Sequence, residues 1–524
     1  MEGGGRVLSV DVLRAFLVHG VVIGHILRFF EVNSFGLELF TEESPTLNTL
    51  LLCGHMWVVP SLFFLSGYSL FHSLKKSLFT SSSPASVVRI YPDAIAFLLR
   101  RVKSHLAVVF VALFLFVVPK QFLSETECAG VVAPSNLFAF YPFYFVHCFA
   151  SKGFEWLWFI IVLLGLTAFH LPFFLAIHTS SPATTTLTGT RPRPKGRQHQ
   201  HHQNIEGPSL STTALLVYAW IPLACLAAWP LAPFLLFGTG LFYMTLLACT
   251  LLSCGRTSRK QFRQFSSLLP FILFFALFVS YATIVLEDSN NLTRHPFFSF
   301  LFVILLFGFF FVMGFCFANF ERDHLASSSY SSSASSSPAF MIVIALLWFA
   351  VYPLFLPFFD DVTAPTYILL NGFYATYFDN GTTLSSSFTS SASSTFLRFR
   401  FEVGKVYCVI SLFLLSRLCC PSSSSKERAE AEKNKGWLRR TSFFAYLIHP
   451  LLEFMLARLL FLFGQHHPQQ MWLNLMAMVS GTYALLYVSS LFFSRVPVLN
   501  RMFLLCSSSS TSSSSSASPS IKIN

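Results

Sequence analysis

The chain has 524 residues, of which 54% are hydrophobic and only 11% are charged, and this balance excludes an ordinary soluble globular protein. The 35 Lys and Arg residues outnumber the 23 Asp and Glu residues, but they fall in short clusters between apolar runs, which argues against nucleic-acid binding. Apolar runs near the roughly 20 residues that span a bilayer recur along the chain. We therefore expect an all-α, polytopic transmembrane bundle in contact with membrane lipids.

Twelve membrane-spanning helices are predicted from these runs. In chain order they are residues 7–30, 50–72, 104–119, 156–177, 213–229, 231–252, 266–286, 297–318, 339–358, 401–418, 442–463 and 472–493. Loops after even-numbered spans are basic, and the opposite loops are acidic and carry Asn-x-Thr sequons at Asn291 and Asn380. We therefore expect cytoplasmic termini, glycosylation at both sequons, and a secretory-pathway or plasma membrane.

Low-complexity stretches have too little apolar surface to offset the entropy of ordering, so they are predicted to be disordered. They are the loops 178–211, 325–338 and 385–395 and the Ser-rich tail 504–524, which leaves 1–503 as the transmembrane domain. His199, His201 and His202 could bind a metal ion, but a solvated tract is favoured and no metal site is expected.

Eleven cysteines are scattered without a Cys-x-x-Cys pair, which indicates neither a zinc site nor a disulfide scaffold. Cys128 and Cys148 share one predicted lumenal loop. They either form a disulfide or remain free thiols, and both alternatives stay open at this point.

The first span carries ionisable side chains, which are costly at bilayer depth and mark candidate sites. Asp11 and Arg14 can pair on one helix face, and His25, three turns further, shares that face about 16 Å along the axis. A neutral imidazole can take a proton from a hydroxyl, so His25 is the candidate general base. A buried structural histidine is the alternative, and His19, off this face, is expected to be structural.

Later spans add further candidates. Ser66-Gly67-Tyr68 in the second span allows a neighbouring helix or a substrate to approach closely. Arg100, Arg101 and Lys103 before the third span either set topology or hold the phosphates of a nucleotide-bearing cosubstrate. His449 lies next to Pro450 in the eleventh span, where the proline frees a carbonyl group and the imidazole needs a polar partner.

Taken in order, these segments resemble the acyltransferase-3 family, which includes bacterial wall and lipopolysaccharide O-acetylases. The resemblance extends over most of residues 6–503. It is carried by Arg14-x10-His25, Phe63-Phe64-Leu65-Ser66-Gly67-Tyr68, Arg100-Arg101, Leu157-Trp158-Phe159 and Ser442-x-x-x-Tyr446-Leu447-x-His449. It implies acyl transfer from cytosolic acyl-CoA, often acetyl-CoA, to a hydroxyl of a glycan, lipid or small molecule, without a permanently bound cofactor.

The resemblance also implies roles for individual residues. His25 would be essential, Arg14 with its partner Asp11 would belong to the catalytic site, and Arg14, Arg100, Arg101 and Lys103 would serve the donor. The family usually has Arg-x-x-Arg followed by proline here, whereas this chain has Arg101-Val102-Lys103-Ser104-His105. Lys103 or His105 could take the place of the second arginine. A secondary transporter and a catalytically inactive sensor or scaffold are the competing hypotheses, although no internal repeat supports the transporter.

Overall fold

The computed structural model describes the helical frame of the protein. It covers residues 8–30, 45–79, 90–124, 127–128, 130–180, 307–319, 321, 404–416, 425–462, 471–496 and 499. These residues are almost all helical, as expected from their apolar composition. The predicted spans at 213–229, 231–252, 266–286 and 339–358 lie outside this part of the chain, as do the sequons and nearly all of the low-complexity stretches.

The long helices follow the chain in the order α1 (Leu8–Arg28), α2 (Pro45–Phe79), α3 (Ile90–Ala112), α7 (Trp158–Ser180), α15 (Ser425–Leu462) and α16 (Met471–Arg495). A π-helical turn, η3 (Leu113–Val117), joins α3 to α4 (Val118–Ser124). Two further helices cover Phe307–Asn319 and Gly404–Ser416.

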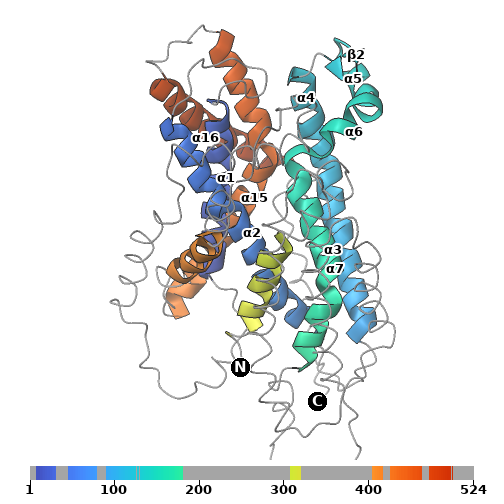
Figure 1. The fold of residues 1–524 in the computed structure, drawn as a ribbon, viewed down its shortest axis with the longest axis vertical. Coiled ribbons are helices and arrows are strands. Elements are labelled where there is room, and N and C mark those ends of the chain that lie inside the picture. The colour runs from blue at the N-terminus through green and yellow to red at the C-terminus, as the bar shows by residue number, and fades with distance from the viewer. Residues whose placement is uncertain are drawn as a thin grey trace, which may run out of the picture.

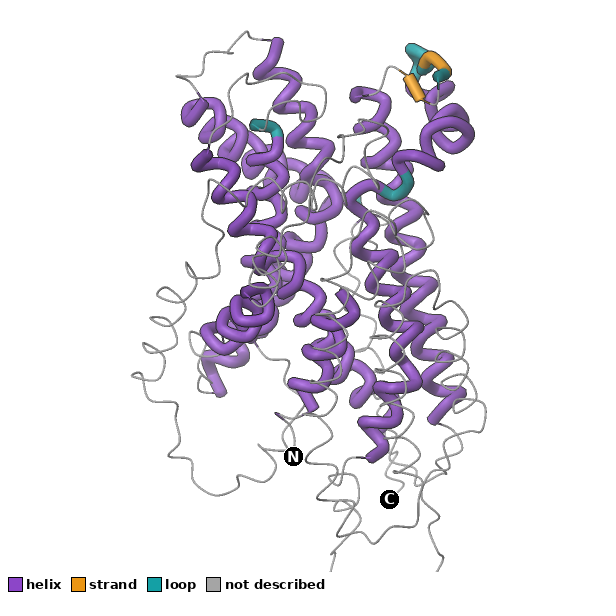
Figure 2. Tube along the Cα trace, viewed as in Figure 1, coloured by secondary structure: helices purple, strands orange, loops and turns teal. Residues whose placement is uncertain are grey.

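A small elaboration separates α4 from α7. It contains the strands β1 (Glu127–Cys128) and β2 (Val131–Val132), which pair antiparallel, then α5 (Leu137–Phe143), η4 (Tyr144–Cys148), α6 (Phe149–Lys152) and η5 (Glu155–Leu157). Figure 2 shows the two strands at one end of the helical frame. Cys128 and Cys148 form a disulfide with a Cα to Cα distance of 5.2 Å, so the first of the two alternatives holds.

Four helical segments are long and apolar enough to cross a membrane, namely Ser9–Arg28, Asp93–Ser124, Thr441–Leu460 and Met471–Arg495. They coincide with the first, third, eleventh and twelfth predicted spans. The second and fourth predicted spans fall on α2 and α7, and the eighth and tenth overlap the two shorter helices. The total of twelve spans and the cytoplasmic position of the termini remain predictions.

The predicted start of the third span, residue 104, was wrong. The helix begins at Ile90, and the candidate membrane-spanning segment of 32 residues begins at Asp93. The basic cluster at positions 100–103 suggested a loop, but Lys and Arg are good helix formers and can extend their charged ends toward water. The cluster therefore lies on the helix itself.

The helices form two groups, which Figure 1 shows side by side. In one group, α1 packs against α15 and contacts α16; in the other, α3 packs against α7. Helix α2 contacts α1, α3 and α7, and the helix Phe307–Asn319 lies against α2 and α7. The apolar core runs through both groups. This arrangement brings the first span directly onto the eleventh.

Helix α2 and the helix Phe307–Asn319 approach each other at two glycines. A Cβ atom at Gly67 would overlap the carbonyl oxygen of Phe311, and one at Gly314 would overlap that of Phe64. Only residues without a side chain allow backbones so close. Gly67 therefore serves the packing of a neighbouring helix.

Candidate active site

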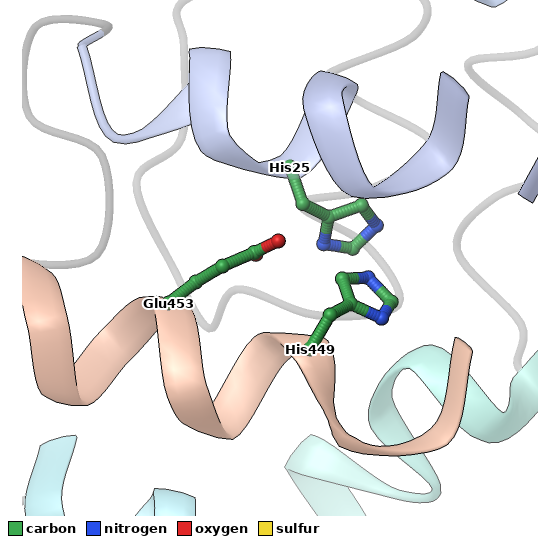
Figure 3. A group of neighbouring side chains, drawn as sticks. All are labelled: His25, His449 and Glu453. Atoms are coloured by element: carbon green, nitrogen blue, oxygen red, sulfur yellow. The ribbon is translucent and has the colours of Figure 1, made fainter. Parts of the chain in front are cut away.

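Three polar side chains from α1 and α15 meet inside the bundle. His449 and Glu453 lie one turn apart on α15 and are both 0% exposed, and His25 faces them from α1 and is half-buried. The rings of His25 and His449 have centroids 5.0 Å apart and meet edge to face. One nitrogen from each ring and a carboxylate oxygen of Glu453 all lie within 4.8 Å of one another (Figure 3). We call these three residues the polar centre.

The tautomer of His449 follows from its backbone contact. Its Nδ1 lies 2.9 Å from the carbonyl oxygen of Ala445. A carbonyl oxygen can only accept a hydrogen bond, so Nδ1 carries the proton and Nε2 presents a lone pair in the neutral ring. This Nε2 atom and both carboxylate oxygens of Glu453 have no hydrogen-bond partner among the described residues. The α15 side of the polar centre thus offers acceptors.

Helix α15 is held against η5, the short helix before α7, by two reciprocal hydrogen bonds. The indole Nε1 of Trp156 donates to the carbonyl oxygen of Leu447 over 3.1 Å, and the Tyr446 hydroxyl donates to the carbonyl oxygen of Trp156. Pro450 lacks an N–H group and leaves the carbonyl of Tyr446 without its usual helical donor. Tyr446 therefore fixes the helix that carries His449 and Glu453.

Of the four residues expected to bind the acyl donor, the structure brings two together. Arg14 donates a hydrogen bond of 2.6 Å to Ser69 and lies 3.5 Å from the buried carboxylate of Asp11. Arg101 is half-buried and close enough to Arg14 for their charges to interact. Arg100 and Lys103 are exposed on the same helix. Arg14 and Arg101 thus form a pair that Arg100 and Lys103 do not join.

The remaining motif residues have structural contacts. Ser66 donates to Leu62 of its own helix over 2.7 Å, and the Tyr68 hydroxyl donates to Glu321 over 2.6 Å. The ring of Trp158 packs against those of Phe63 and Phe307. These side chains stabilise the packing of the helices that carry them.

The sequence did not single out Glu453. Two features of the sequence pointed to it. An acidic residue within an apolar span is a candidate site by default, and the spacing of four residues places Glu453 one helical turn from His449. His19, which was expected to be structural, accepts or donates a hydrogen bond of 3.1 Å with Tyr483 of α16.

A second buried polar group lies on the α4 side of α15. Lys120 forms an ion pair of 3.2 Å with Glu155, and Gln121 donates to the same carboxylate. The Nζ atom of Lys120 stands 5.9 Å from the ring centre of Phe454, the residue after Glu453. The charge of Lys120 is therefore paired with Glu155.

Comparison with known families shows the family to which the chain belongs. The family model described as "Acyltransferase domain", that of acyltransferase 3, matches residues 7–359, more than half of the chain. The match includes Asp11, Arg14, His25 and Arg101, and ends before His449 and Glu453. Comparisons with curated proteins and with solved structures gave no significant match. The chain therefore belongs to the acyltransferase-3 family of membrane acyltransferases.

Proposed function

We propose that this protein transfers an acyl group, typically acetyl, from cytosolic acyl-CoA to a hydroxyl of a glycan, lipid or small molecule, with His25 as the general base. Membership of the acyltransferase family supports the reaction type. The observation that supports the role of His25 is its position in the polar centre, where its ring contacts that of His449. Half-burial leaves the ring within reach of a substrate.

The reaction balances without a further reactant. The hydroxyl oxygen attacks the thioester carbonyl carbon while the imidazole of His25 takes the hydroxyl proton. The new C–O ester bond forms, the C–S bond breaks, and the sulfur leaves as a thiolate. The proton held by His25 then passes to this thiolate, which gives the free thiol of CoA and restores the neutral base.

The pair of Arg14 and Arg101 suits the phosphates of the donor. Arginine offers several fixed N–H donors to phosphate oxygens. Asp11 lies beside Arg14, whereas the Nε atom of Arg101 has no hydrogen-bond partner among the described residues. Two guanidinium groups held close together repel each other, so a bound anion would stabilise both. Arg100 and Lys103, being exposed, would add long-range attraction.

The disulfide supports the proposed membrane. Disulfides persist in oxidising compartments, and Cys128 and Cys148 belong to the loop predicted to be lumenal. The sequons at Asn291 and Asn380 are predicted on the same side. We therefore place the protein in a secretory-pathway or plasma membrane, with its termini and the acyl-CoA donor on the cytoplasmic side.

An acyl-transfer assay with a matched histidine control tests the proposal. Purified protein would be incubated with radiolabelled acetyl-CoA and an extract of cellular glycans and lipids, and labelled ester products would be counted. His25→Ala should abolish product formation, whereas His170→Ala should not, because buried His170 on α7 bonds Leu166 in its own helix. Full activity of a folded His25→Ala protein would reject the assignment. A protein that transports substrate but forms no ester would favour the transporter instead.

A further inference from the structure

We propose that His25, His449 and Glu453 also bind a divalent transition-metal ion such as Zn²⁺, and that the bound ion switches acyl transfer off. Two histidines with one carboxylate form a donor set that zinc uses in proteins, usually with a fourth position left for another ligand. The three side chains come from two helices that hold each other in place, α1 and α15. The sequence had led us to expect no metal site.

The polar centre already has the geometry of a loose metal site. Zinc lies about 2.0–2.2 Å from nitrogen and oxygen ligands, so the ligands of a tetrahedral site are about 3.3 Å apart. The donor atoms here lie within 4.8 Å of one another. Small rotations of the side chains close this gap, and Figure 3 shows the Glu453 carboxylate directed toward the two rings.

The hydrogen-bonding state of the centre supports a cation rather than a neutral guest. Because Nδ1 of His449 is committed to Ala445, the lone pair on Nε2 points away from the backbone and is available as a ligand. The Nδ1 bond is also the outer contact that orients metal-binding histidines in proteins. Glu453 adds two buried oxygens that accept nothing from the described residues.

The charge balance points the same way. An ionised carboxylate in an apolar interior is costly unless a cation lies beside it. The nearest basic side chain on α4, Lys120, is paired with Glu155 instead. Nothing described here forms an ion pair with Glu453. A divalent ion bound to the polar centre would neutralise this carboxylate.

Metal binding would compete with catalysis. A nitrogen of His25 that coordinates the ion cannot take a proton from the acceptor hydroxyl. This inhibitory consequence rests on the function proposed above, whereas the binding itself does not. Removal of the ion by a chelator would return the base to its active state, so metal supply in the compartment would regulate acyl transfer.

Zinc binding by the purified full-length protein tests the site. The tract with His199, His201 and His202 could bind zinc by itself, so all measurements would be made in a background with these residues changed to Ala. After treatment with EDTA, the protein would be titrated with ZnCl₂ by calorimetry, and bound zinc counted by mass spectrometry. We expect one ion per chain, and no comparable binding of Mg²⁺, because imidazole ligands disfavour it.

Variants then identify the ligands. Glu453→Gln and His449→Gln should each weaken zinc binding by more than the roughly 10- to 100-fold that outer partners of a metal site contribute. His170→Gln is the control, since His170 is also buried and also bonds a backbone carbonyl through Nδ1, yet lies outside the centre. If the two buried variants fail to fold, the half-buried position of His25 makes His25→Gln the deciding variant.

The outcomes separate the two proposals. Equal zinc affinity of the reference protein and the folded ligand variants would overturn the metal site, whatever the activity. Zinc binding that requires the three ligands, in a protein without acyl transfer, would support the site and contradict the proposed function. Acyl transfer that zinc inhibits and EDTA restores, together with zinc binding that is weakened in Glu453→Gln, would support both.

Discussion

The indole nitrogen of Trp156 donates a hydrogen bond to the carbonyl oxygen of Leu447, which ties η5, the short helix before α7, to the middle of α15. The Tyr446 hydroxyl returns a bond to the carbonyl oxygen of Trp156. This pair of contacts lies one turn before the polar centre. The position of His449 and Glu453 relative to α1 therefore depends on a contact with a third helix.

Loss of this contact should reduce both stability and turnover. Tyr446→Phe leaves the buried carbonyl of Trp156 without its donor, which should cost about 1–3 kcal/mol in the free energy of unfolding. Because α15 would then be less well positioned, kcat should fall. The KM for acyl-CoA should change by a smaller factor. Thermal unfolding and steady-state kinetics measure the two effects. Trp158→Phe is the control, since the described contacts of Trp158 are with other rings; an equal loss in both variants would contradict the assignment.

His25→Ala should lower kcat by about a hundred- to ten-thousand-fold, the usual contribution of a general base, and leave the affinity for acyl-CoA nearly unchanged. Single-turnover rates and equilibrium binding of acetyl-CoA would separate the two quantities. If donor binding is lost together with turnover, His25 belongs to the donor site. His449 would then become the candidate base.

Arg14 should contribute to donor binding rather than to the chemical step. Arg14→Gln leaves the buried carboxylate of Asp11 without its cation, so the single variant should lose about 1–3 kcal/mol of stability. The double variant Asp11→Asn/Arg14→Gln removes both charges and should recover much of that loss. Its KM for acyl-CoA should remain raised. A double variant with unchanged KM would exclude Arg14 from the donor site.

Gly67→Ala should force apart α2 and the helix Phe307–Asn319, because the added methyl group would overlap the carbonyl oxygen of Phe311. Overpacking of this kind costs about 1–3 kcal/mol. Gly54→Ala in the same helix meets no atom within 4 Å and should be neutral or slightly stabilising. Thermal unfolding of the two variants in the same detergent gives the comparison. Equal stability of both variants would mean that the close approach is not required.

The Cys128 and Cys148 thiols should react with a maleimide only after reduction, since they form a disulfide. Cys128→Ser/Cys148→Ser should lower stability by about 2–4 kcal/mol, the typical contribution of a disulfide. Mass spectrometry of peptides prepared with and without reductant would detect the bond in protein taken from cells. Labelling of both thiols without reduction would contradict the bond and weaken the argument for an oxidising compartment.

Part of the site could be predicted from the sequence. Helical spacing placed Arg14 and His25 on one face, and the segment from Ser442 to His449 was singled out as a set. The adjacency of α1 and α15 could not be derived, because no local pattern tells which distant helix a given face will contact. Glu453 was missed although its spacing from His449 was visible. The disulfide stayed open because sequence separation does not determine the Cα and Cβ geometry that the bond requires.

The error at the third span has a physical cause as well. Positive charges mark loops on average, yet the long side chains of Arg100, Arg101 and Lys103 can direct their charged ends away from an apolar surface while the backbone stays helical. A cluster of positive charges is therefore a weak guide to a helix boundary.

The π-helical turn η3 changes which residues of the third span share a side. In an uninterrupted α-helix, Arg101 and Lys120 would point about 100° apart, because nineteen steps of roughly 100° leave that remainder after five turns. One extra residue wound into the π turn shifts everything after it back by about one step. Beyond the turn, the Lys120 amine lies 5.9 Å from the ring centre of Phe454 on α15. A single inserted residue thus changes the direction of every side chain in the last turns of this long helix by about one helical step.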